Sequence, residues 1–179
     1  CRKYAEKLIA EKGFEMAALG NGVEVNVPAP EVNLLLLSSH ILKHALGVGI
    51  GLRQLCDYAV AKRHYEGRVN EEEMRNVWRM TGLERWQELL EGFVGTFLCH
   101  SERSEESFDE KKTDVLLDIV LKGGNFGVYS EDRAKASRAR WSRKLHTFRS
   151  FAGNIGFALR YAPGEWFWTA AQLFGGQVR

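Results

Sequence analysis

Cysteine and proline are scarce in this chain of 179 residues, which contains three of each. The cysteines, Cys1, Cys56 and Cys99, are odd in number and form no CxxC pair. This usage excludes a disulfide framework and a zinc-finger spacing, and it fits a reducing, cytoplasmic setting. We therefore expect Cys56 and Cys99 to be small buried hydrophobic side chains.

Long uncharged runs are also missing. The longest one near the end, Trp166 to Val178, is shorter than the roughly 20 residues of a membrane-crossing helix. No basic start leads into an apolar stretch, so we expect no signal peptide. The chain begins with Cys1 rather than Met, which suggests a fragment or a processed product. Hydrophobic residues make up 45% and charged residues 27%, as in a globular domain with a buried core.

Charge is distributed unevenly along the chain. Residues 1–132 carry 16 basic and 22 acidic side chains, a net charge of −6. Residues 133–179 carry 9 basic and 1 acidic side chains, a net charge of +8. This asymmetry indicates that the C-terminal region meets something acidic. The acidic body of the same chain, a phosphate-bearing ligand, a nucleic acid and a membrane surface all fit that description.

Hydrophobic periodicity predicts a mainly α fold, a helical bundle-like domain with one or two short β-strands near the N-terminus. The alternating stretch 23–27 is the predicted strand, and it must pair with another strand, a missing N-terminal region or a second copy. Asn70 with Glu73 predicts a variant capping box. Residues 101–110 are predicted to be a loop or insertion. The predicted helices are 2–12, 31–46, 52–65, about 70–80, 83–99, 115–122, a long basic helix reaching Leu159, and 166–174.

His40 and His44 lie four residues apart, which places them on one face of the predicted helix. Such a pair can bind a metal, but the glutamate of an HExxH motif is absent and no third ligand is near. We therefore predict no metal site. The two side chains are expected either to line a cleft as polar contacts or to form a structural pair.

Glycines precede the next predicted helix, at Gly47, Gly49 and Gly51. Glycine before a helix start lets the backbone approach a phosphate closely. Arg53 follows in the first turn, where the helix dipole favours anions rather than cations, so a role beyond helix stability is indicated. Asp57 lies four residues on, where it can pair with Arg53 along the helix. The alternative is a helix–loop–helix corner fixed by that ion pair.

The segment Gly123-Gly124-Asn125-Phe126-Gly127 contains three glycines in five residues, which implies unusual backbone angles or a close approach to a ligand. Asn125 tolerates a left-handed conformation. The alternative is a helix end followed by a turn.

Two of these segments together resemble a bacterial nucleotidyltransferase-like family. The stretch HILKHALGVGIGLRQLCDYA, residues 40–59, and the stretch LKGGNFG, residues 121–127, are similar to the later motifs of that family. The helix before Gly13 and the PAPE segment at residues 28–31 also resemble it, so the likeness runs from Tyr4 to Gly127. It implies that residues 1–30 are a remnant of an α/β catalytic core and that residues 31–179 are a helical domain, with basic, aromatic helices at 133–179.

The resemblance implies transfer of a nucleotidyl group from a nucleoside triphosphate to an acceptor, with Mg²⁺ held by paired carboxylates. No Asp-x-Asp pair stands on a plausible strand here, and Glu24 is the only carboxylate candidate, so the chain is expected to be incomplete for catalysis. Substrate-binding residues implied by the likeness are His40, His44, Gly49, Gly51, Arg53, Asp57, Gly124 and Asn125.

A second hypothesis makes the chain a non-catalytic helical interaction module or oligomerisation domain. Its interface to a protein partner or a second copy would be the basic C-terminal region and the cluster Trp166-Phe167-Trp168. The two hypotheses differ in whether the chain binds a nucleotide.

Overall fold

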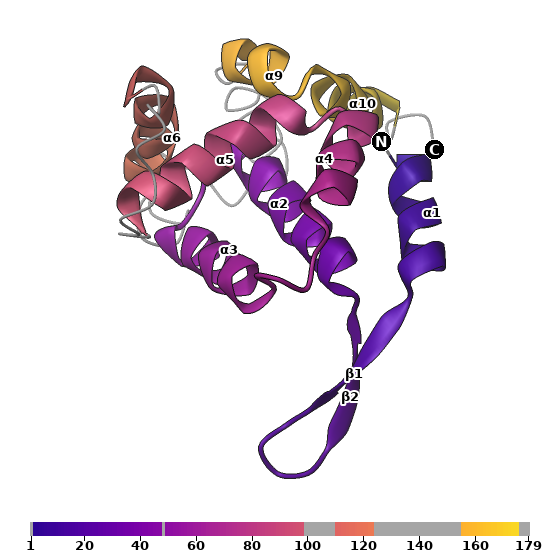
Figure 1. Ribbon diagram of the computed structural model, residues 1–179. Helices are drawn as coiled ribbons and strands as arrows, with labels where there is room; N and C mark the ends of the chain where they lie inside the picture. Colours follow the sequence, from indigo (N-terminus) through magenta and orange to yellow (C-terminus); the bar gives the residue numbers. More distant parts are fainter. Residues whose placement is uncertain (1, 48, 99–109, 124–154, 176–179) are drawn as a thin grey trace, which may run out of the picture.

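The computed structural model describes residues 2–47, 49–98, 110–123 and 155–175. Within these ranges the chain forms eight helices and one antiparallel sheet of two strands near the N-terminus (Figure 1). The prediction of a mainly α fold with short N-terminal strands is therefore confirmed. None of the helices in the described ranges has the length and apolar character needed to cross a membrane. The predicted loop at 101–110, except its last residue, and most of the basic stretch after residue 133 lie outside these ranges.

The first half of the fold is one helix, a hairpin and two helices. The second half is helical throughout the described ranges. In chain order the elements are α1 (Arg2–Lys12), β1 (Phe14–Ala18), β2 (Glu24–Pro28), α2 (Pro30–Leu46), α3 (Leu52–His64), α4 (Glu71–Thr81), α5 (Glu84–Phe97), α6 (Glu110–Gly123), α9 (Ile155–Tyr161) and α10 (Pro163–Gly175).

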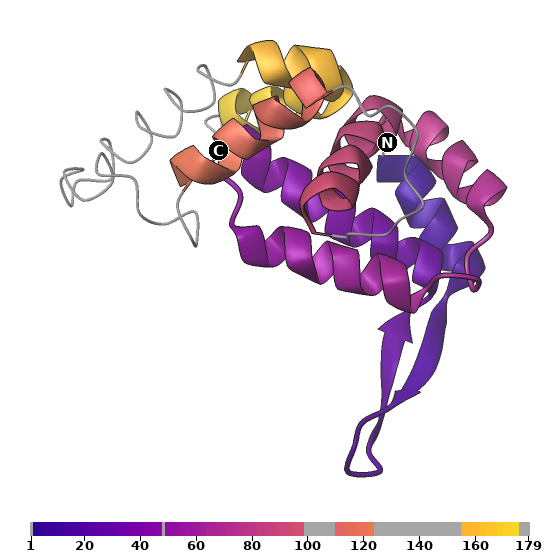
Figure 2. The same cartoon turned by 60° about the vertical axis from the view of Figure 1, so that its left-hand side comes forward.

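Helices α2 and α5 form the centre of the helical body. α2 contacts α1, α3, α5 and α9, and α5 contacts α3, α4, α6 and α9 as well (Figures 1 and 2). Burying one large apolar side chain stabilises a fold by roughly 1.5–3 kcal/mol, so this shared core accounts for most of the stability. Its largest fully buried side chains are Trp86, Tyr58, Phe93, Ile41, Leu42, Ile50, Leu55, Leu83, Leu90, Leu116, Val32 and Val77.

A buried polar junction joins α2, α3 and α5. Trp86 Nε1 donates to Ser38 Oγ at 3.0 Å, and Ser38 Oγ donates to Gln87 Oε1 at 2.8 Å. Gln87 Nε2 in turn donates to Tyr58 OH and, at 2.9 Å, to Glu91 Oε1. Every member is thus hydrogen-bonded, as buried polar groups must be to avoid a desolvation cost. Burial, and then the charge of Glu91, raise the pKa of Tyr58, which keeps its phenol protonated.

Helix α4 shows how local sequence sets a helix boundary. The Asn70 side chain accepts from the backbone N–H groups of Glu72 and Glu73 at 3.0 and 3.1 Å, and Gly82 ends the helix in a left-handed conformation with φ of 74°. The predicted capping box is only half right. Instead of returning to the Asn70 backbone, the Glu73 carboxylate binds Lys12 on α1 at 2.8 Å.

The hairpin projects away from the helical body (Figures 1 and 2). Strand β2 confirms the predicted strand, whereas β1 was not predicted because Glu15, Ala17 and Ala18 favour strands weakly. The turn closes through Gly22, whose N–H donates to the Leu19 carbonyl at 2.9 Å and whose φ is 79°. This is a three-residue loop with a glycine bulge, which fixes the register of the strands. Of the pairing partners considered above, the structure shows that the two strands pair with each other.

Candidate functional site

The corner between α2 and α3 brings together four of the residues predicted to bind substrate: His44, Gly49, Gly51 and Arg53. The His44 carbonyl, at the end of α2, accepts from the N–H groups of Gly47 at 3.1 Å and Gly49 at 2.9 Å. Gly49 has φ of 99°, a conformation that a side chain would strain. The segment therefore folds tightly over the end of α2, as its glycines predict.

Helix α3 begins directly after this corner. Gly51 donates its N–H to Gln54 Oε1 at 3.0 Å, and Gln54 donates its own N–H to the Gly51 carbonyl at 3.0 Å. Ile50 is fully buried and anchors the corner in the core. The position of Arg53 in the first turn is thus held by backbone contacts and apolar packing rather than by its own charge.

Arg53 and Asp57 are both exposed and form no ion pair with each other in the described part of the chain. The ion pair that the helical spacing allows is therefore not formed between these two residues in the described structure. An exposed pair one turn apart gains little in water, because solvent screening and side-chain entropy offset the attraction. No acidic residue stands in the first turn of α3, so no side chain of that turn neutralises the Arg53 cation.

The His40 and His44 rings touch edge to face, with centroids 4.6 Å apart and an interplanar angle of 69°. The prediction that they share one helix face is confirmed by this contact. His40 is exposed and His44 is half-buried. Burial, and to a smaller extent the charges of His40 and Lys43, lower the pKa of His44, which is therefore a neutral imidazole near pH 7. Among the described residues no three or more His, Cys, Asp or Glu side chains gather into a metal site.

Of the other predicted residues, Asp57 and Glu24 lie away from the corner. Asp57 lies one turn further along α3, with its side chain exposed. Gly124 and Asn125 lie outside the described residues. Glu24, the carboxylate candidate, is exposed on the hairpin opposite Ala18.

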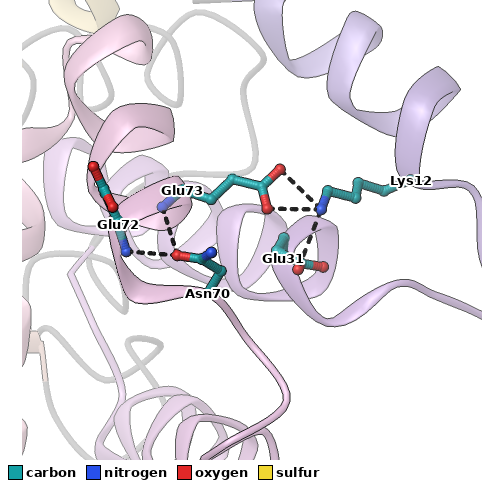
Figure 3. A network of polar contacts seen from close by, with 5 residues as sticks. All are labelled: Lys12, Glu31, Asn70, Glu72 and Glu73. Carbon is teal, nitrogen blue, oxygen red and sulfur yellow. Dashed lines mark hydrogen bonds and ion pairs between the residues drawn. The ribbon is translucent and has the colours of Figure 1, made fainter.

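Sequence reasoning missed one charged cluster, which Figure 3 shows. Lys12 Nζ on α1 lies 2.8 Å from the Glu73 carboxylate on α4 and 3.5 Å from Glu31 on α2. A hydrogen bond to Glu73, and then the Glu31 charge, raise the pKa of Lys12 against the opposing effect of burial. Since Glu31 is only 7% exposed, the cluster acts as a clamp between three helices. No local signal reveals it, because the partners are 19 and 61 residues from Lys12.

No protein-family model, curated protein or solved structure matches the chain.

Proposed function

We propose that this chain is the helical part of a cytoplasmic nucleotidyltransferase-like protein and that its α2–α3 corner binds the phosphate groups of a nucleotide. In this proposal the chain takes part in transfer of a nucleotidyl group to an acceptor without holding a complete catalytic centre. The observation that carries the proposal is that Arg53, which follows the tight glycine segment at the start of α3, is exposed and forms no ion pair with any described residue.

The electrostatics of the corner favour an anion. The first turn of a helix presents backbone N–H groups and the positive end of the helix dipole. Arg53 adds a guanidinium there, and no acidic side chain of that turn offsets it. A cation in this place costs helix stability unless a negative ligand binds. A phosphate would contact both the guanidinium and the backbone, and Arg suits phosphate because its fork allows two parallel hydrogen bonds.

The histidine pair complements this charge without adding to it. Because the pKa of His44 is lowered, its ring offers one donor and one acceptor nitrogen at neutral pH. Those groups suit a ribose hydroxyl or a base edge better than a phosphate. In the proposal, His40 and His44 orient the uncharged part of the ligand while Arg53 holds its phosphates.

The corner does not fit the Mg²⁺ that the resemblance implies. Magnesium in nucleotidyl transfer is held by carboxylates. Among the described residues the corner offers an arginine and two imidazoles, and the single carboxylate of Asp57 lies one turn further along α3. We therefore derive no catalytic step through a metal here. The proposed role is binding and orientation of the nucleotide.

The test compares ligands with and without phosphate on wild-type chain and two matched variants. A nucleoside triphosphate should bind, and the corresponding nucleoside should bind at least about tenfold more weakly, because it lacks the group that Arg53 contacts. Arg53→Ala should abolish the preference for phosphate. Arg63→Ala removes the same charge at the other end of α3 and should leave affinity unchanged. An equal loss of nucleotide affinity in both variants would mean that only the net charge of the chain matters, and it would reject a phosphate site at the corner.

The second function, a non-catalytic interaction module, is favoured by a different observation. Large apolar side chains are exposed on the hairpin, where Phe14 is 63% and Met16 is 60% exposed, and on α10, where Phe167 and Trp168 face solvent. Surfaces of this kind commonly bind a partner protein or a second copy. A chain that associates with itself and binds no nucleotide at millimolar concentration would favour this function over the first.

A further inference from the structure

The hairpin of β1 and β2 is a ladder of only two strands, so half of the backbone groups of each strand point away from its partner. A two-stranded ribbon is marginally stable alone, and this one stands clear of the helices over most of its length (Figures 1 and 2). Its base is fixed by the ion pair between Arg68 and Glu15 at 2.7 Å. The ribbon is therefore presented in a set direction while its two edges stay open.

The register shows which backbone groups point outward. In an antiparallel pair, every second residue pair exchanges hydrogen bonds, and the residues between them direct their N–H and C=O groups to the open edge. Ala29 N–H donates to the Gly13 carbonyl at 3.2 Å, and Leu19 N–H donates to the Val23 carbonyl at 2.7 Å, so these are bonded pairs. Counting by two along the register, the outward-facing residues are Phe14, Met16 and Ala18 on β1, and Glu24, Asn26 and Pro28 on β2.

The two edges differ in how they are protected. On β2, Pro28 has no N–H to offer and Glu24 places a charge on the edge, and both features discourage strand addition. On β1 the three outward-facing residues are uncharged, non-proline residues. Phe14 and Met16 also project apolar side chains into solvent. The β1 edge is thus open to pairing with another strand.

We propose that β1 pairs antiparallel with β1 of a second copy of this chain, across a two-fold axis at Met16. The result is one sheet in the order β2-β1-β1-β2, continuous through both copies. Phe14 then lies opposite Ala18 of the partner subunit, so a large side chain meets a small one. The outward-facing backbone groups of one strand meet those of the other, as a bonded ladder requires.

Charge favours this register over the neighbouring register that is centred on Glu15. With the axis at Met16, Glu15 lies opposite Ala17 of the partner subunit, and no like charges face each other. With the axis at Glu15, the two Glu15 carboxylates would face each other directly, which is destabilising. The strand is therefore complementary to itself in the register centred on Met16, the property that an isologous two-fold contact needs. In the same register, the exposed Leu19 near the tip of one hairpin lies opposite Gly13 of the partner subunit, at the base of the other hairpin.

The experiment measures molar mass by light scattering and sedimentation for wild type, Met16→Lys and Asn26→Lys. The register places Met16 and Asn26 side by side on one sheet face but on opposite edges, so both lysines add the same charge to the same ribbon. Wild type and Asn26→Lys should be dimers. Met16→Lys should raise the dimer dissociation constant at least about tenfold, because two lysines would meet on the axis. A monomeric wild type, or a Met16→Lys dimer as tight as wild type, would overturn the proposal.

A second pair of variants covers the case in which Met16→Lys fails to fold. Met16→Cys should form a cross-linked dimer on mild oxidation, since bonded antiparallel neighbours have Cα atoms about 5.5 Å apart, within disulfide range. Asn26→Cys carries the same native cysteines and should not cross-link beyond the wild-type level. Equal cross-linking in both variants would contradict pairing through β1. These readings are separate from nucleotide binding, so the two proposals stand or fall independently.

Discussion

Helices α2 and α3 carry two groups of polar residues, which differ in whether their side chains have hydrogen-bond or ion-pair partners. On the side facing α5, Ser38 and Tyr58 are buried and connected through Gln87 by hydrogen bonds. At the corner where the two helices meet, Arg53 is exposed with no ion pair to Asp57, and the histidines contact mainly each other. The same two helices thus carry a buried network whose polar groups all bind one another, called the closed set, and an exposed group at the corner, called the open set.

The difference separates polar groups that hold the fold from polar groups available to a ligand. A buried donor or acceptor that loses its partner costs roughly 1–3 kcal/mol, so the closed set is tied to stability. An exposed cation costs little to remove and is free to meet an anion. Substitutions in the first set should therefore change the free energy of unfolding, whereas substitutions in the second should change binding.

The largest effect is expected at the centre of the closed network. Gln87→Leu removes the amide that accepts from Ser38 and donates to Tyr58 and Glu91. We expect a loss of about 2–3 kcal/mol in the free energy of unfolding, because buried groups on two helices lose a partner. Urea unfolding followed by circular dichroism measures this loss. A change below about 0.5 kcal/mol, as at an ordinary surface site, would show that the network does not hold the fold.

A smaller effect is expected at the clamp between α1, α2 and α4. Lys12→Met leaves the Glu31 and Glu73 carboxylates without their cation (Figure 3). We expect about 1 kcal/mol of destabilisation, because Glu31 is largely buried while Lys12 and Glu73 are partly solvated. The matched control is Lys7→Met on the same helix, whose ion pair with Glu11 is exposed and should contribute almost nothing. Equal urea midpoints for the two variants would mean that the clamp is no stronger than a surface pair.

In the open set we expect the pKa of His44 to differ from that of a free imidazole. The His44 imidazole should titrate below its ordinary pKa of 6.5, because burial disfavours the charged ring. The neutral His44 ring contributes fully to the free energy of unfolding above pH 6.5. This contribution is lost as the pH falls from 6.5 through the lower folded-state pKa, because the unfolded chain takes up the proton first. His40→Gln should move the midpoint upward by removing a nearby positive charge, without restoring 6.5. Proton NMR of the ring signals follows both midpoints, and a wild-type midpoint at or above 6.5 would contradict the burial of His44.

Much of the fold was predictable because it follows from local patterns. The apolar spacing predicted helices that correspond to α2, α3, α4 and α5, and α4 ends at Thr81, close to the predicted end. Strand β1 was missed because its residues favour strands weakly and its pairing with β2 comes from the register of the hairpin. The Lys12 clamp and the network around Gln87 were also missed, since their members are far apart in sequence.

The candidate site was predictable in part for the same reason. His44, Gly49, Gly51 and Arg53 are close in sequence, so a single turn between two helices brings them together. The ion pair that spacing allows between Arg53 and Asp57 does not form in the described structure, because helical spacing permits such a pair without making it favourable in water. Gly124 and Asn125 depend on the path of the chain after α6, which local pattern does not determine.

The most direct test of the open corner combines two readings on one variant. Calorimetric titration of a nucleoside triphosphate with magnesium into wild type and Arg53→Ala measures binding, and urea unfolding of both measures stability. We predict that wild type binds, that Arg53→Ala loses at least about tenfold in affinity, and that the two unfold within about 0.5 kcal/mol of each other. Absence of binding by wild type at millimolar nucleotide, or equal affinity in the variant, would contradict a phosphate site at the α2–α3 corner.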